Sequence, residues 1–167
     1  QLQYQESAPS TAIDLNFNHP VKEIIFAGNR GTGAATATES MATHNRICVS
    51  GTTPARTLAS SAGNGTAIGL KLNGHERFTP QHLDYFTRTQ VWQHHTGNGG
   101  VSTPDSLGVY SFALKPEEHQ PSGTCNFSRI DNAQLTFSTS PKSDGDNIQI
   151  YAINYNVLRI MSGMGGL

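Results

Sequence analysis

The 167-residue sequence has few charged residues and no concentration of charge of one sign. It contains 11 basic and 12 acidic residues, a net charge of -1, and no run of three basic residues. Proteins that bind nucleic acid by neutralising phosphates need a concentrated basic patch, so this class of function is disfavoured. A net charge near zero also leaves little repulsion between copies, which permits self-association.

Cysteine and long apolar runs are scarce as well. The two cysteines, Cys48 and Cys125, do not make a disulfide framework in a chain of this length, and we expect reduced, partly buried thiols. No apolar run reaches the length of a membrane-spanning helix. Because the sequence starts at Gln1 rather than Met, we expect it to be a piece of a longer protein.

The residues that are present favour short strands joined by turns. With 17 glycines, 8 prolines and only 35% hydrophobic residues, the composition suits strands better than helices. In most apolar segments, apolar and polar residues alternate, as in strands with one dry face and one wet face. These patterns predict strands over residues 1–5, 12–17, 21–28, 67–72, 108–114, 133–138 and 148–160, with weaker ones over 45–51 and 87–95.

Two of these segments give more specific predictions. In GVYSFALKP, Tyr110, Phe112 and Leu114 share a face, and we expect them to anchor the core. In the last segment, the apolar face moves from even to odd positions between Ile150 and Ile153 and later moves back. This change predicts a β-bulge in a long, bending strand.

One short helix and several long loops complete the prediction. The helix is expected over TPQHLDYF (79–86), with Thr79 as its cap and Pro80 at its first position. Loops rich in Gly, Ala, Thr and Ser are expected to contact partners, and they span residues 28–45, 53–66 and 97–108. With about eight or nine strands and no internal repeat, the chain is predicted to form one all-β domain, a sandwich or a jelly roll.

The pair His94 and His95, in WQHHTG, raises the question of a metal site. On a strand, adjacent side chains point to opposite faces, so the two rings cannot bind one ion. We expect one histidine to point inward, held by a hydrogen bond, and the other to lie in solvent.

The carboxylates Glu117 and Glu118 lie between Pro116 and Pro121, which predicts a stiff, exposed turn. Solvated or locally paired carboxylates are expected there rather than a catalytic pair. Cupin metal enzymes need His-x-His and later Pro-x-Gly-x-x-His, but QHHTG lacks the intervening residue and Asn126 stands at the second histidine position. Asn64 and Asn126 begin Asn-x-Ser/Thr triplets, which are possible glycosylation sites expected to occur by chance.

Several segments resemble, in order, the C-terminal part of the major capsid protein of nucleocytoplasmic large DNA viruses, the family of iridovirus, phycodnavirus and mimivirus-like capsids. They are LNFNHPVKEIIF, LKLNGHERF, QVWQHHTG, GVYSFALKPEEHQPSGTCNFSRIDNAQLTF and IYAINYNVLRIMSGMGGL. The resemblance implies an all-β fold, an eight-stranded antiparallel jelly roll that is the second barrel of a double jelly-roll protein. Residues 1–167 would form a single jelly-roll domain, with 1–12 as the incoming strand and linker from a missing N-terminal jelly roll.

The same resemblance implies a structural protein of the virion capsid, assembled in the host cytoplasm, and no enzyme, cofactor or metal. Its partners would be itself in a homotrimeric, pseudo-hexagonal capsomer, neighbouring capsomers and minor capsid proteins. It would not contact nucleic acid directly, and an internal viral membrane would lie nearby without insertion. We expect Glu118, His119, Arg129 and Asp131 to be structural polar residues of a corner. Arg129 and Asp131 would share a face of a strand and tie this corner down.

A function of another class stays open, that of a β-sandwich carbohydrate-binding module. Such a module needs a surface aromatic platform or clustered acidic calcium ligands, for which Trp92, Asp144 and Asp146 are the candidates. A metal enzyme of the cupin type is a third hypothesis.

Overall fold

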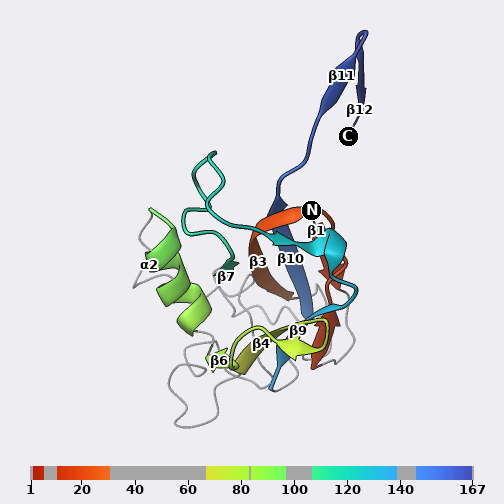
Figure 1. Cartoon of the computed structure of the whole chain (residues 1–167). Coiled ribbons are helices and arrows are strands. Elements are labelled where there is room, and N and C mark those ends of the chain that lie inside the picture. Colours follow the sequence, from red (N-terminus) through yellow and green to blue (C-terminus); the bar gives the residue numbers. More distant parts are fainter. Residues whose placement is uncertain are drawn as a thin grey trace, which may run out of the picture.

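The computed structural model describes residues 2–5, 11–30, 67–82, 84–96, 107–138 and 146–166. Their strands form two antiparallel sheets and a separate hairpin (Figure 1). The first sheet has the order β1 (Leu2–Gln5), β10 (Asp146–Asn154), β3 (Pro20–Arg30), β7 (Leu107–Ser111), with β8 (Cys125–Asn126) also on β3. The second has the order β2 (Ala12–Asp14), β9 (Ala133–Phe137), β4 (Ala67–Leu72), β5 (His75–Glu76), with β6 (Gln81–His82) also on β4.

The hydrophobic core unites apolar side chains of both sheets. The first sheet contributes residues such as Ile24, Phe26 and Ile150, and the second contributes Ile13, Ile68, Leu70, Leu135 and Phe137. In the second sheet these residues sit at alternate positions, as predicted, because a pleated strand turns every other side chain inward. The predicted all-β jelly-roll class is confirmed. Each main sheet contains five strand segments in the described ranges, so the predicted count of eight stays a prediction.

The region expected to be a weak strand over 87–95 is helical, so that prediction is wrong. A π-helical turn, Tyr85–Thr89, continues into α2, Gln90–His94. β-Branched and aromatic residues in this segment favour strands by propensity, but Phe86 and Gln90 are both buried at a spacing of four. Burial of one helical face against the core therefore overrides the propensity.

The helix expected over 79–86 begins later than predicted. Gln81 and His82, which were expected inside it, form β6 and pair with Ile68 and Ala67 of β4. Pro80 thus precedes a strand rather than opening a helix.

The strand of GVYSFALKP follows the prediction only in part. Tyr110 and Phe112 pack against the core, but Leu114 is 73% exposed, so its predicted role as a core anchor is wrong. The physical reason is that β7 ends at Ser111 and the chain then bends, which stops the alternation of faces. Ala113, which strand alternation would place on the opposite face from Leu114, is buried instead.

The last strand contains an irregularity, but it comes later than the predicted bulge between Ile150 and Ile153, because Ile150 and Ala152 both stay buried and Ile153 is exposed. The register between β10 and β3 shifts between Ile153 and Asn154. The apolar residues that follow do not continue the sheet, because a separate hairpin, β11 (Arg159–Met161) and β12 (Met164–Gly166), carries them away from the sandwich (Figure 1).

Some predictions fall outside the described residues. They concern the strand over 45–51, most of the three loops, Cys48, Asn64 and Asp144. Among the described helices, none has the length and apolarity to cross a membrane.

Candidate functional site

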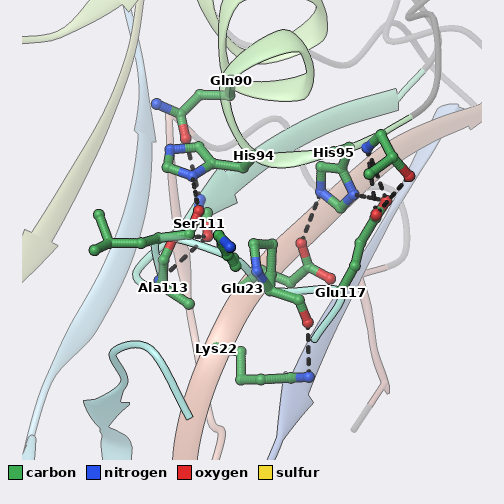
Figure 2. Close-up of polar contacts among 12 residues, drawn as sticks. Lys22, Glu23, Gln90, His94, His95, Ser111, Ala113 and Glu117 are labelled. Atoms are coloured by element: carbon green, nitrogen blue, oxygen red, sulfur yellow. Dashed lines mark hydrogen bonds and ion pairs between the residues drawn. The ribbon is translucent and has the colours of Figure 1, made fainter. Parts of the chain in front are cut away.

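Polar side chains concentrate where the helical segment meets the first sheet and the loop that follows β7 (Figure 2). We name four of these residues the His95 cluster: Glu23, His95, Thr96 and Glu117. Glu23 lies on β3, His95 caps the C-terminal end of α2, and Glu117 lies in the turn after β7. One imidazole thus joins three segments that are about 20 to 90 positions apart in the sequence.

The imidazole of His95 lies between two carboxylates. Its Nε2 is 2.9 Å from Glu23 Oε2, and its Nδ1 is 3.0 Å from Glu117 Oε1. Despite this distance, neither Glu23 Oε2 nor His95 Nε2 has a hydrogen-bond partner among the described residues. The pairing with Glu23 is therefore electrostatic.

Glu23 is the most buried member of the cluster. Its side chain is 4% exposed, and that of His95 is 18% exposed. A carboxylate so far from water is costly unless an opposite charge or a donor compensates it. His95 is the described group that provides this compensation, which makes the contact important for stability.

Glu117 is held mainly by Thr96. The Thr96 hydroxyl donates to Glu117 Oε2 at 2.7 Å, and the Thr96 N–H donates to Oε1 at 3.2 Å. These hydrogen bonds from Thr96, followed by the one from His95, lower the pKa of Glu117 below the ordinary value of 4.5. The donors favour the charged carboxylate over the neutral acid.

This shift predicts a pH dependence of stability that Glu117 carries. A lowered pKa in the folded state stabilises the fold above about pH 4.5, and this contribution is lost as the pH falls through the lowered value. We expect Glu117→Gln to reduce the melting temperature at pH 7, and the difference from wild type to shrink towards zero in acid. Thermal unfolding of both proteins at a series of pH values measures it.

The neighbouring carboxylate provides the control for this experiment. Glu118 pairs with Lys115 at 3.0 Å, and both side chains are more than half exposed. Such surface pairs contribute little, so Glu118→Gln should leave the melting temperature nearly unchanged at every pH. A Glu117→Gln difference that persists unchanged in acid would contradict the assigned role of the carboxylate.

Further polar contacts fix the same junction. His94 Nδ1 lies 3.0 Å from the carbonyl oxygen of Leu114, and the Gln90 side chain accepts from the Ser111 N–H at 3.2 Å. The Lys22 ammonium donates to the Pro116 carbonyl at 2.7 Å. The expectation that one of the two histidines lies free in solvent is wrong, because α2 presents both to the loop after β7.

The four residues expected at the polar corner, Glu118, His119, Arg129 and Asp131, make none of the contacts described above for this junction. Glu118 is only the sequence neighbour of Glu117. Arg129 ends a short 3-10 helix, Phe127–Arg129, and Asp131 lies beyond it, so the prediction that both share a strand is wrong. The strand that begins at Cys125 contains only two residues, because Asn126 accepts a hydrogen bond from the Ser128 N–H and starts the helical turn. His119 is exposed. Asp131 contacts Asn73 through its backbone, because its N–H donates to Asn73 Oδ1 at 2.9 Å.

Sequence reasoning missed Glu23, Gln90 and Thr96 as members of this junction. A signal for Glu23 was present, since a carboxylate interrupts the apolar strand VKEIIFAG and a charge in such a strand needs a partner. No comparable signal marks Thr96, whose role depends on a loop that approaches from 21 positions away.

The chemistry available at the junction is that of a structural link. The described residues contain no group of three or more His, Cys, Asp or Glu side chains that could hold a metal ion. Burial raises the pKa of the Cys125 thiol, which disfavours the reactive thiolate. The contacts of Glu23, His94, His95 and Thr96 described above each connect one segment of the fold to another.

Comparison with known proteins identifies the family. The sequence profile described as "Large eukaryotic DNA virus major capsid protein" matches residues 1–166. The chain belongs to this family. It is 41% identical to the major capsid protein of Pyramimonas orientalis virus, over 100% of this chain and 41% of the relative. With that of Paramecium bursaria Chlorella virus 1 the identity is 38%, over 100% of this chain and 47% of the relative.

The solved structures agree with this membership. The chain is similar to the capsid protein in the PBCV-1 virus capsid, with a TM-score of 0.66 and 33% identity, over 99% of this chain and 49% of that chain. Similarity to the Faustovirus major capsid protein, with a TM-score of 0.54 and 18% identity, covers 91% of this chain and 31% of that one and concerns the fold alone. The resemblance seen in the sequence is confirmed, and the chain spans less than half the length of the relatives it matches.

Proposed function

We propose that this chain is the second jelly roll of a viral major capsid protein and that its work is self-association into a shell. The observation that carries the proposal is the family match over residues 1–166, supported by a fold that covers about half of a capsid chain. Residues 1–167 then form one domain, and residues 1–12 bring the chain in from a preceding jelly roll.

The proposed partners follow from this role. Three copies of the full-length protein form a pseudo-hexagonal capsomer, and capsomers contact one another and minor capsid proteins in the virion. Assembly takes place in the host cytoplasm over an internal membrane that the protein does not enter. A net charge of -1 is consistent with association between identical copies and with the absence of direct contact to nucleic acid.

The polar residues of the fold hold shape in this proposal and carry out no reaction. The His95 cluster joins β3, α2 and the loop after β7, and it supplies neither a metal set nor an activated thiol among the described residues. Glu118, His119, Arg129 and Asp131 are exposed and available for contacts between subunits.

A carbohydrate-binding role receives less support. Trp92 is 81% exposed on α2, and among the residues whose burial is described the other exposed large aromatic side chain is Tyr151, on β10. A sugar platform requires aromatic side chains side by side, and the lone Trp92 does not provide one.

Assembly of the full-length protein tests the proposal. We expect sedimentation to show a trimer and electron microscopy to show capsomers or closed shells. A full-length protein that stays monomeric over a wide range of concentration and salt, in the presence of the minor capsid proteins, would refute the assembly role.

A further inference from the structure

A hairpin arm projects away from the two sheets of the jelly roll (Figure 1). We use this name for residues 156–166, which lie beyond the end of β10 (Figure 1). Just before the arm, the Tyr155 N–H donates to the Pro20 carbonyl at 2.9 Å. Within the arm, β11 and β12 pair only with each other among the described strands, through three residue pairs. A two-stranded hairpin of this size is not stable alone in water, so the fold requires something to cover it.

The surface of the arm is strongly apolar. Five of its side chains are between 54% and 80% exposed: Val157, Leu158, Ile160, Met161 and Met164. Arg159 is the one charged residue in the segment. A contiguous apolar surface of this kind marks a site of protein contact rather than an ordinary wet hairpin.

Both faces of the arm are apolar. Met161 pairs with Met164 on one face, and Ile160 pairs with Gly165 on the other, where Leu158 also lies close to Gly165. The turn between the strands is tight, because Ser162 and Gly163 both have positive φ, as in the hairpin turns that match strand twist. The arm is thus a shaped element that is suited to insertion between apolar surfaces.

The base of the arm lies where the preceding polypeptide enters the domain. β1 pairs with β10 so that Leu2 faces Tyr151, close to the end of β10 from which the arm departs. Figure 1 shows the N-terminal end of the chain beside this end of β10. The relatives are more than twice as long as this chain, and the preceding jelly roll of the proposed function would end next to the arm.

Exposed apolar side chains continue from the arm onto the sheet. Tyr151 and Ile153 of β10 are 37% and 40% exposed, and they precede the arm by only a few residues. A domain that covered the arm would therefore also cover this part of the outer face of the first sheet.

We infer that the hairpin arm is buried against the preceding domain of the same polypeptide and not against a neighbouring copy. The inference rests on the proposed function, because the preceding jelly roll is part of that assignment. A domain tethered at the base of the arm meets it at a far higher effective concentration than a second molecule does. The arm then locks two domains of one chain into a rigid unit.

Photo-crosslinking in the full-length protein tests which partner covers the arm. Ile160 is replaced by a photoreactive phenylalanine analogue, and the assembled protein is irradiated and separated under denaturing conditions. We expect a cross-linked product of monomer mass that joins the arm to a peptide of the preceding domain. A product of dimer mass, or no protein cross-link, would overturn the inference. The same analogue in place of the exposed Trp92 on α2 is the control, and it should give no such link to the preceding domain.

A pair of charge substitutions tests what the contact does. Ile160→Asp with Met164→Asp should raise the amide exchange rates of residues 159–166 in the full-length protein by tenfold or more and split one thermal transition into two. The control Asn156→Asp adds charge at the base of the arm, and its carboxylate can replace the amide oxygen that accepts from the Val157 N–H at 2.8 Å. Unchanged exchange and a single transition in the double variant would refute the locking role.

The two hypotheses fail in different ways. An intramolecular link in a protein that never forms capsomers would leave the inference standing and refute the proposed function. Normal capsomers in which the arm is cross-linked to a second chain would refute the inference and leave the proposed function standing.

Discussion

Replacing Phe86 by alanine is expected to lower the free energy of unfolding by about 3–5 kcal/mol. Phe86 is fully buried and forms the centre of an aromatic group, with ring centroids 5.1 Å from Tyr85, 5.7 Å from Phe26 and 5.8 Å from Phe78. Truncation removes the apolar burial and leaves a cavity that neighbouring rings cannot fill completely. For a protein of this size the melting temperature should fall by roughly 6–20 °C.

Trp92 provides the matched control, because it is a large aromatic residue on the same helical segment. Its side chain is 81% exposed, so Trp92→Ala should change the unfolding free energy by no more than about 0.5 kcal/mol. Thermal and denaturant unfolding of both variants measure the contrast. Equal effects at the two positions would mean that the helical segment does not pack on the core as described.

The second large effect is expected for His95→Ala. This change leaves the carboxylate of Glu23, whose side chain is 4% exposed, without the imidazole whose Nε2 lies 2.9 Å from its Oε2. With both groups charged, breaking a buried ion pair from one side costs about 3–5 kcal/mol, and we expect no more than about 3 kcal/mol because water can reach the 18% of His95 that is exposed. The loss should appear in the denaturant midpoint at pH 7.

Two further variants separate the ion pair from mere loss of volume. His94→Ala removes one hydrogen bond to the Leu114 carbonyl and should cost only about 1 kcal/mol. Glu23→Gln in the His95→Ala background should restore about 1 kcal/mol or more, since it removes the uncompensated charge. A double variant no more stable than His95→Ala would show that Glu23 and His95 are not coupled.

The strands of the second sheet could be predicted from the sequence because the information is local. Ile68 and Leu70 on β4, like Leu135 and Phe137 on β9, lie two positions apart and are buried, because a pleated strand turns every second side chain to the same face. The change of apolar face predicted an irregularity in the last strand, but neither its position after Ile153 nor its partner strand. The family, too, could be recognised from the sequence, because several segments resemble those of the family and occur in the same order.

The helix and the His95 cluster could not be predicted in this way. The helical conformation of Gln90–His94 depends on Phe86 meeting side chains of β3 and β7. The cluster forms only when three separate segments bring the carboxylates of Glu23 and Glu117 to 2.9 and 3.0 Å from the ring nitrogens of His95. Such contacts depend on how the whole chain folds, and neighbouring residues do not encode them.

The sequence alone determined the pleated sandwich and the membership of the capsid family. The reason is that the alternation of apolar and polar residues, and the segments that resemble the family, can both be read from short stretches of sequence. Only the tertiary structure decided which polar groups meet, and which apolar groups do not. It requires glycine at position 108, where a Cβ would lie 2.3 Å from the Phe26 ring, and it leaves Leu114 and the hairpin arm uncovered. The physical reason is that burial depends on what lies opposite a side chain, and that neighbour comes from a distant part of the chain or from another domain.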